Sequence, residues 1–312
     1  MILLEDIRRA AESIKPTAII TPLIFSPALS RMFGGDIYLK LENLQTTGSF
    51  KIRGATYKLA ECRDGIGPEG VVAASAGNHA QGLALAAREA GLPATIVMPE
   101  WVSISKQEAT RSYGGKVVIS GQSVAESLAK AEELSGQGKT FIHPFDDTDI
   151  ITGQATVGLE IFDQLPDPDL IVAPVGGGGL IAGIAAWVRQ QQPDIRIIGV
   201  EPDDSDAMRQ SLAAGAPVDL GHVGIIADGV AVRRVGDETF RLCEELVDEI
   251  ITVDTDQTCA AIRDIFEDTR SIVEPAGGLA VAGAKKYAAE HGLKGRTLVT
   301  ISCGANVNFD RL

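Results

Sequence analysis

The feature that most constrains the fold is the alternation of short apolar runs with longer amphipathic stretches along almost the whole chain. Amphipathic stretches with helical periodicity include residues 80–90, 123–134, 179–191 and 256–268. The apolar runs between them have the length of strands and lie at residues 37–41, 71–74, 94–98, 116–120, 170–175, 195–201, 249–253 and 297–302. Strands that alternate with helices form parallel sheets covered on both faces. The sequence therefore predicts an α/β protein.

The division of the chain into lobes is less clear, because no repeat, low-complexity tract or long linker interrupts it. A length of 312 residues suits one large domain or two lobes around a cleft. The sequence His-Pro-Phe-Asp-Asp at residues 143–147 could join two lobes. We then expect a small lobe over residues 45–145 and a large lobe made of residues 1–44 and 146–312.

Composition favours a cytoplasmic protein that acts on small molecules. A net charge of −14 argues against a nucleic-acid surface, which needs a basic stripe. No apolar run approaches the roughly 18 residues of a membrane span, and the start lacks the basic region of a secretory signal. The cysteines do not have the spacing of a disulfide framework, and neither they nor the histidines have the spacing of a metal site. These residues are Cys62, Cys243, Cys259, Cys303, His79, His143, His222 and His291.

Lys51 is the first candidate catalytic residue. It lies in the sequence Gly-Ser-Phe-Lys-Ile-Arg-Gly-Ala, residues 48–55, at the expected start of a helix and directly after Phe50. A lysine that forms a Schiff base with an aldehyde cofactor needs a packed environment that lowers its pKa. A lysine in the first turn of a helix is more often a solvated surface residue, so Lys51 requires support from other segments.

Residues 75–82, Ser-Ala-Gly-Asn-His-Ala-Gln-Gly, follow one apolar run and precede a helix. The free N–H groups and the dipole of a helix start favour an anion, here a substrate carboxylate. Ser75 adds a hydroxyl, and Asn78 adds an amide that can bond a ring oxygen. The alternative is an ordinary capped turn, in which Ser75 and Asn78 only satisfy backbone groups.

Four consecutive glycines, Gly176 to Gly179, follow the run at 170–175 and lead through Leu180 into another helix. Without Cβ atoms, several backbone amides can approach one phosphate. The same segment also fits a dinucleotide-binding pattern through Gly177, Gly179 and Ala182, with Glu201 as the ribose-binding acid about 20 residues later. Taken alone, this segment favours a nicotinamide enzyme.

Cys303 follows the last apolar run and precedes Gly304. Most free cysteines are small buried hydrophobic residues. In the functional interpretation, its sulfur lies beside the ring nitrogen of a pyridine cofactor. A neutral partner leaves that nitrogen largely unprotonated, which favours prompt loss of a β-leaving group over a long-lived carbanion.

Together these segments resemble the fold-type II pyridoxal phosphate (PLP) enzymes, and specifically the threonine dehydratases. The resemblance extends from Thr21-Pro22-Leu23 to residues 304–309, Gly-Ala-Asn-Val-Asn-Phe, and residues 228–232 and 236–239 point to the biosynthetic branch, which serves isoleucine biosynthesis. It implies two parallel-sheet lobes with PLP between them, and conversion of L-threonine to 2-oxobutanoate and ammonia, with L-serine to pyruvate as a side reaction. It also implies a homodimer or homotetramer.

The resemblance assigns a role to each candidate residue. Lys51 would form the Schiff base with PLP and act as the catalytic base, Phe50 would lie against the ring, and Asn78 would bond the phenolic oxygen. Cys303 would face the pyridine nitrogen. Two backbone segments would bind anions: Gly176, Gly177, Gly178, Gly179 and Leu180 the phosphate, and Ser75, Ala76, Gly77, Asn78 and His79 the substrate carboxylate.

Three departures from the family pattern qualify the resemblance. Many relatives have serine where this chain has Cys303. Serine racemases have a second serine at the position of Ala76, where it acts as an acid and base on the face opposite the lysine. Metal-binding relatives have an acid six residues after the residue that matches Glu201, where this chain has Ala207, so no metal is expected.

The resemblance also bears on regulation and on the competing functions. Biosynthetic dehydratases continue into a domain that senses isoleucine, whereas this sequence stops at Leu312, so we expect no regulatory domain here and no response to isoleucine.

A serine racemase or a β-replacement synthase would share every motif. A nicotinamide-dependent oxidoreductase or a non-enzymatic amino-acid-binding module would have no use for Lys51.

Overall fold

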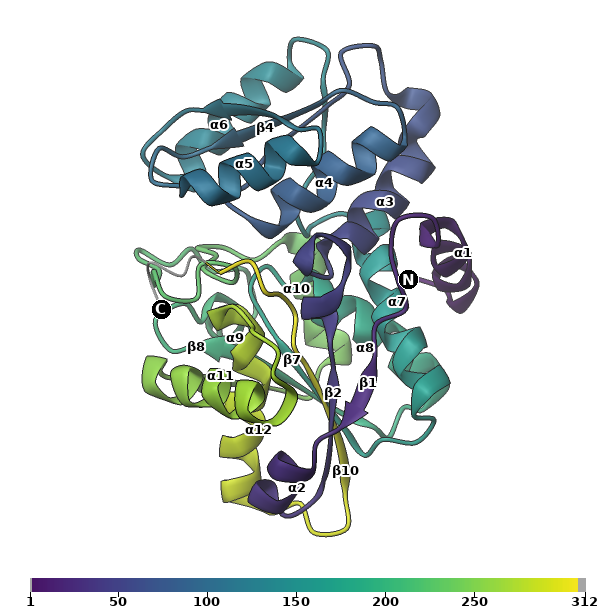
Figure 1. Ribbon diagram of the computed structural model, residues 1–312, viewed down its shortest axis with the longest axis vertical. Helices are drawn as coiled ribbons and strands as arrows, with labels where there is room; N and C mark the ends of the chain where they lie inside the picture. The colour runs from purple at the N-terminus through teal and green to yellow at the C-terminus, as the bar shows by residue number, and fades with distance from the viewer. Residues whose placement is uncertain (1, 308–312) are drawn as a thin grey trace.

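The computed structural model describes residues 2–307 and confirms an α/β protein built on two sheets (Figure 1). The six-stranded sheet has the order β1 (Leu23–Phe25), β2 (Asp36–Lys40), β10 (Thr297–Ile301), β7 (Leu170–Pro174), β8 (Arg196–Pro202) and β9 (Glu249–Val253). The four-stranded sheet has the order β5 (Lys116–Ile119), β4 (Ala94–Met98), β3 (Val71–Ala74) and β6 (Thr140–Phe141). We call the two halves the large lobe and the small lobe.

All strand pairs are parallel except β1 with β2, which are antiparallel at one edge of the large sheet. Every predicted strand is present, and its ends differ from the prediction by no more than one residue. Strands β1 and β6 were not predicted, because runs of three and two residues are too short to show a periodicity.

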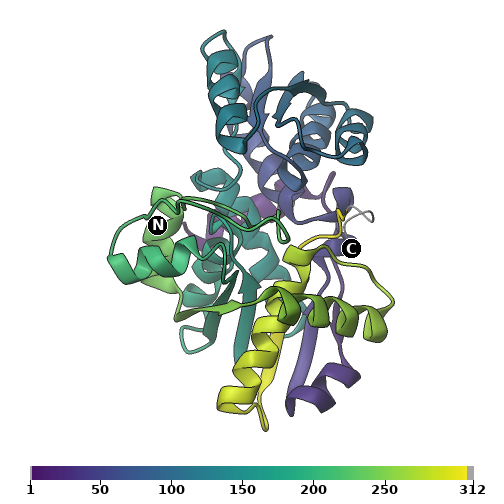
Figure 2. The ribbon, with the colours of Figure 1, turned by 90° about the vertical axis from the view of Figure 1, so that its left-hand side faces the viewer.

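Helices cover both sheets (Figures 1 and 2). Those between the strands of the small lobe are α4 (Asn78–Glu89), α5 (Ile104–Ser112) and α6 (Val124–Ser135). Those that follow in the large lobe are α8 (Gly179–Gln191), α9 (Ala207–Ala214), α10 (Asp237–Leu246), α11 (Thr255–Thr269) and α12 (Pro275–His291), with α2 (Pro27–Phe33) near the start. The remaining three, α1 (Leu4–Ile14), α3 (Lys51–Cys62) and α7 (Thr148–Gln164), lie where the lobes meet.

Each sheet has its own hydrophobic core. Strands β7 and β8 are buried on both faces in the larger core, as expected for the centre of a parallel sheet. The smaller core includes Ala10 and Ile14 from α1 and Ile150 from α7, while Ile7 of α1 belongs to the larger core. Helix α1 therefore packs against both lobes, although the sequence indicated a place with the large lobe alone.

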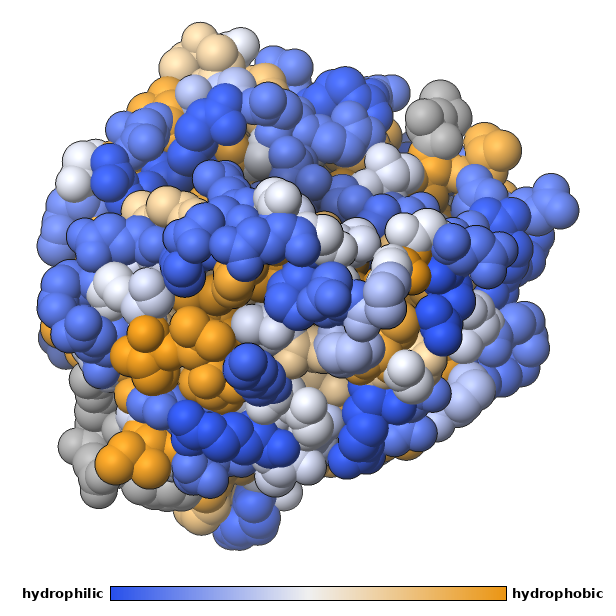
Figure 3. Space-filling view, turned by 90° about the horizontal axis from the view of Figure 1, so that it is seen from above, coloured by the Kyte–Doolittle hydropathy of each residue, from blue (hydrophilic) through white to orange (hydrophobic). Residues whose placement is uncertain are grey.

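The surface is mostly polar in the view of Figure 3, where small hydrophobic groups lie between hydrophilic side chains. Among the helices of residues 2–307, none combines the length and the apolar character that crossing a bilayer requires.

A buried cluster of charged side chains joins the lobes. Arg53 of α3 donates to Glu42 Oε1 at 2.7 Å and to Glu160 Oε2 of α7 at 2.9 Å, and Lys40 of β2 donates to Glu160 Oε2 at 2.6 Å. Arg53, Glu42 and Lys40 are fully buried, and Glu160 is 8% exposed. Charges in such an environment require partners, because an unpaired buried charge is strongly destabilising.

We predict that Arg53→Met lowers the free energy of unfolding by about 3–5 kcal/mol, because it leaves two buried carboxylates without their main partner. Urea denaturation followed by circular dichroism measures the change. The matched control is Arg241→Met, which removes a half-exposed ion pair with Glu238 and should cost no more than about 1 kcal/mol. Equal effects of the two substitutions would contradict a structural role for the buried cluster.

Candidate functional site

The predicted site segments follow the carboxyl ends of three parallel strands, the usual position of ligand sites in α/β proteins. Residues 75–77 connect β3 to α4, which begins at Asn78, residues 175–178 connect β7 to α8, and Cys303 follows β10. Lys51 begins α3, as predicted. The structure brings these segments from both lobes together through the contacts described below.

Lys51 lies in a packed environment rather than on the surface. Its Nζ donates to the carbonyl oxygen of Pro144 at 3.0 Å and lies 5.2 Å from the centre of the Phe50 ring. Burial lowers the pKa of Lys51 to about 8. A substantial fraction of this amine is therefore neutral near pH 8, which nucleophilic or base catalysis requires.

Cys303 lies beside the Lys51 segment. The backbone N–H of Phe50 donates to the Cys303 carbonyl at 3.3 Å, and Ser49 forms an antiparallel bridge with Gly304. The thiol is 3% exposed, and burial raises its pKa well above the ordinary value. Cys303 is therefore a neutral thiol at physiological pH.

The glycine loop is shaped so that only glycine fits. A Cβ on Gly177 would lie 2.2 Å from the Phe145 ring, and one on Gly176 would lie 2.8 Å from Val230 Cα. Gly178 has φ +93°, a left-handed conformation that other residues rarely adopt. The backbone N–H groups from Gly176 to Leu180 have no acceptor within residues 2–307, so this loop is a cradle for an anion.

The loop between β3 and α4 forms a second group of free amides. Ser75 Oγ accepts from the N–H groups of Gly77 and Ala80, at 3.3 and 3.2 Å, and so fixes the turn. The N–H groups of Ala76, Asn78 and His79 have no acceptor among the described residues. These amides can bind a carboxylate at the start of α4.

The His79 side chain takes no part in this group of free amides. Its Nε2 lies 3.2 Å from the Ile142 carbonyl oxygen, and burial lowers its pKa to about 3. The ring is therefore neutral and donates to the small lobe. Only the backbone of His79 is available to a ligand.

A salt bridge between the lobes lies next to residues 75–77, the loop between β3 and α4. Lys106 Nζ of α5 lies 2.6 Å from Asp228 Oδ2 of the large lobe. The same nitrogen lies 3.7 Å from the position that a Cβ on Gly77 would occupy. This pair was not predicted, because residue 228 stands out in the sequence only as part of a family segment.

Asn78 contacts two residues whose role was not predicted from the sequence. Its Nδ2 donates to Glu274 Oε1 at 2.5 Å, and its Oδ1 accepts from Asn306 Nδ2 at 2.7 Å. Glu274 precedes Pro275, the first residue of α12, so its sequence context indicates only a helix start. Asn306 lies in the quoted terminal motif, whose residues 308 and 309 are outside the described part of the chain.

Glu201 lies near the carboxyl end of β8, as a ribose-binding acid would, but its carboxylate already has other partners. Its carboxylate is buried and accepts from the backbone N–H groups of Met208 and Arg209, at 2.8 and 2.9 Å, so it caps α9. Burial raises its pKa to about 8. This structural role accounts for Glu201 without a nicotinamide cofactor.

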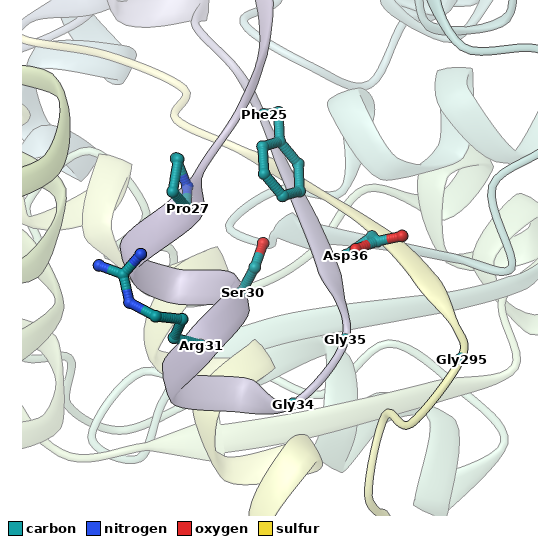
Figure 4. A pocket seen from close by; sticks show the side chains of 8 residues that line it. All are labelled: Phe25, Pro27, Ser30, Arg31, Gly34, Gly35, Asp36 and Gly295. Carbon is teal, nitrogen blue, oxygen red and sulfur yellow. The ribbon is translucent and has the colours of Figure 1, made fainter.

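A surface pocket lies away from these residues (Figure 4). Its Asp36 and Gly295 are at the amino ends of β2 and β10, whereas Cys303 follows the carboxyl end of β10. None of the predicted site residues lines it, and its lining consists of Phe25, Pro27, Ser30, Arg31, Gly34, Gly35, Asp36 and Gly295.

Residues 14–304 match the family model described as pyridoxal-phosphate dependent enzyme. The biosynthetic L-threonine dehydratase of Pasteurella multocida is 48% identical over 294 residues, which are 94% of this chain and 57% of that enzyme. The chain spans about half the length of the curated relatives it matches.

Two solved structures show the same fold. The processed form of threonine deaminase isoform 2 from Solanum lycopersicum is 42% identical with a TM-score of 0.95, over 98% of this chain and 85% of that one. Maize serine racemase is 34% identical with a TM-score of 0.94, over 98% of this chain and 94% of that one.

We predict that Lys51, freed of any bound aldehyde, is half neutral near pH 8, because burial opposes its charged form. An ordinary lysine reaches that point only near pH 10.4. Labelling with trace acetic anhydride over a pH series, followed by peptide mass spectrometry, gives the midpoint for each lysine. A Lys51 midpoint near that of an ordinary lysine would contradict the predicted shift.

Proposed function

Because the chain belongs to the family of pyridoxal-phosphate dependent enzymes, we propose that it converts L-threonine to 2-oxobutanoate and ammonia. L-Serine, converted to pyruvate and ammonia, is the slower substrate. The observation that carries the proposal is the environment of Lys51, an amine of lowered pKa placed next to Cys303 and near two loops of free amides. The name of the Pasteurella multocida relative supports the choice of threonine.

The residues present fit PLP. The cofactor has a phosphate, an aldehyde, a phenolic oxygen and a pyridine nitrogen, and the site has one suitable group for each. The glycine cradle, which any Cβ would fill, suits the phosphate through the amides of residues 176–180. Lys51 would hold the aldehyde carbon, Asn78 the phenolic oxygen and Cys303 the pyridine nitrogen, with Phe50 beside the ring. When bound, PLP withdraws electrons and stabilises negative charge at the substrate Cα.

Substrate binding would use backbone amides. The N–H groups of Ala76, Asn78 and His79 bind the carboxylate of the amino acid, and Ser75 and Gly77 shape the turn that presents them. Binding at the start of α4 would orient the substrate relative to Lys51. Such orientation accounts for a large part of catalysis in reactions of this kind.

Lys51 would act as the base. Its Nζ, as a neutral amine, would accept the proton from the substrate Cα. A pKa of about 8 leaves enough neutral amine at neutral pH to accept that proton. The β-hydroxyl then leaves with a proton as water, and a molecule of water returns when the released enamine hydrolyses to 2-oxo acid and ammonia. The water lost and the water regained cancel, so threonine yields 2-oxobutanoate and ammonia with no other reactant.

Racemisation of serine is the second candidate, because maize serine racemase shares the fold closely. Ala76 argues against it. Racemisation needs a proton donor on each face of the planar carbanion, and a methyl group at the position of Ala76 supplies none. Cys303 would face the pyridine nitrogen as a neutral thiol with no negative charge to hold a proton there, which would favour elimination further.

We also propose the division of the enzyme into lobes, its oligomeric state and its compartment. The small lobe comprises residues 45–145 and the large lobe the rest of the described chain. Large hydrophobic side chains are exposed near the amino-terminal segment, at Ile19, Ile20 and Leu44, and support a homodimer or homotetramer. We assign the enzyme to the cytoplasm on its composition.

Lys51→Ala should lower 2-oxobutanoate formation by at least about a thousandfold, because it removes both the covalent anchor and the base. The fold should be retained, since residues 176–180 do not depend on Lys51. A coupled 2-oxo acid assay with purified protein measures the rate, and circular dichroism checks the fold. Lys130→Ala, on the outer face of α6, is the matched control and should be unaffected. Activity of Lys51→Ala within tenfold of wild type would refute the assignment.

Incubation with L-serine should release pyruvate with little D-serine, because Ala76 cannot deliver a proton to the face opposite Lys51. Chiral chromatography of the mixture, alongside a pyruvate assay, gives the ratio. Ala76→Ser should raise the share of D-serine by restoring a hydroxyl at that position. D-Serine from the unchanged protein at a rate comparable to pyruvate would mean that another residue serves the second face.

A further inference from the structure

The amide of Asn78 is held at both ends by the opposite lobe. Asn78 begins α4 of the small lobe, whereas Glu274 and Asn306 belong to the large lobe. The amide nitrogen donates to Glu274 at 2.5 Å, and the amide oxygen accepts from Asn306 at 2.7 Å. The mechanism above makes no use of either partner.

Neighbouring groups determine which way each amide points. Asn306 Nδ2 also donates to the carbonyl oxygen of Thr47 at 2.8 Å. A backbone carbonyl can only accept, so the nitrogen of Asn306 must face Thr47 and Asn78. Asn78 then has to present its oxygen to Asn306 and its nitrogen to Glu274. Glu274 Oε1 accepts at the other end, so the arrangement is consistent at both ends. Burial raises the pKa of Glu274 to about 7, and both forms of the carboxyl keep an oxygen that can accept.

The Thr47 carbonyl is presented by an unusual backbone. Thr47 has φ 67° and ψ 10°, and within residues 2–307 only Arg270 is another non-glycine residue with positive φ. This conformation costs a threonine about 1–2 kcal/mol. Such strain persists where the surroundings impose it, often at functional sites. Here the strained residue lies directly before the Lys51 motif, residues 48–55, and directs its carbonyl at Asn306.

Two glycines make room for the Glu274 carboxyl, which belongs to a residue only 2% exposed. A Cβ on Gly304 would lie 2.3 Å from Glu274 Oε1, and one on Gly229 would lie 3.3 Å from the same atom. Gly304 directly follows Cys303, and Gly229 directly follows Asp228. The Glu274 carboxyl therefore lies within the site, in space that the two glycines leave free.

We propose that Glu274 and Asn306 are positioning residues that fix the Asn78 amide for the cofactor. An amide nitrogen has two N–H groups. Glu274 takes one and sets the orientation, which leaves the second directed and free to donate to the phenolic oxygen. Since the two partners lie in the large lobe, Asn78 is oriented only when the lobes are together. This inference rests on the proposed placement of PLP beside Asn78.

A double-mutant cycle on the holoenzyme tests the inference. The cofactor dissociation constant and the absorption maximum of the bound cofactor are measured for Asn78→Ala, Glu274→Ala, Asn306→Ala and the double variant Asn78→Ala/Glu274→Ala. Each single variant should weaken cofactor binding by about tenfold and shift the absorption maximum, as expected for one hydrogen bond to a charged group. The double variant should bind no more weakly than Asn78→Ala, because Glu274 acts through Asn78.

Two further variants separate orientation from charge and from stability. Glu274→Gln keeps an oxygen that can accept from Asn78, so cofactor affinity should stay within about twofold of wild type. Glu201→Gln alters another buried acid, outside the site, and should leave the spectrum unchanged. Additive losses in the double variant, loss of affinity in Glu274→Gln, or wild-type affinity in Glu274→Ala would overturn the positioning role.

A different set of results would show that the proposed placement of the cofactor beside Asn78 is wrong. If Asn78→Ala itself leaves both affinity and spectrum unchanged, the placement of the cofactor beside Asn78 is wrong, and the positioning role is overturned with it. If Asn78→Ala has its effect but Glu274→Ala has none, the placement stands and only the inference about Glu274 fails.

Discussion

The buried interaction of Arg53 with Glu42 and Glu160 sets the position of the site. Arg53 lies two residues after Lys51 on α3, and its guanidinium reaches a carboxylate that precedes the small lobe and another on α7. If these three side chains were buried apart from one another, each charge would carry a large desolvation cost. The three segments that carry them are therefore held together in the folded state. The first turn of α3, and with it Lys51, is thereby fixed relative to the large lobe, although the sheet of the small lobe follows it in sequence.

Close backbone packing adds to this constraint. A Cβ on Gly153 of α7 would lie 2.6 Å from Gly54 Cα, and one on Gly82 of α4 would lie 3.1 Å from the Lys51 carbonyl carbon. Helix α3 therefore packs against α7 on one side and α4 on another with backbone in contact. Because a close-packed interior resists displacement in every direction, the position of Lys51 depends on both lobes. The glycine of the Lys51 motif at position 54 is explained by this packing and not by the chemistry.

The sequence could predict those parts of the protein that depend on local pattern. The strands were located within one residue because buried parallel strands are continuous apolar runs. Local motifs also made Lys51, Cys303 and the glycine loop the candidate site residues. Glu274 and Asn306 were not given roles because they meet Asn78 across separations of 196 and 228 residues. No periodicity or spacing encodes a contact of that kind. The straddling position of α1 was missed for the same reason, since its two faces pack on two separate cores.

In the proposed site, backbone amides rather than charged side chains would bind the two anions. A net charge of −14 repels an anionic cofactor and an anionic carboxylate at long range. Lys51 is partly neutral because burial lowers its pKa, and Lys106 is paired with Asp228. The amides at the starts of α4 and α8 carry partial positive charge that burial does not remove and that no proton transfer can cancel. Two anions bound in this way would leave Lys51 free to exist as a neutral amine, which a lysine used as a counter-ion could not do.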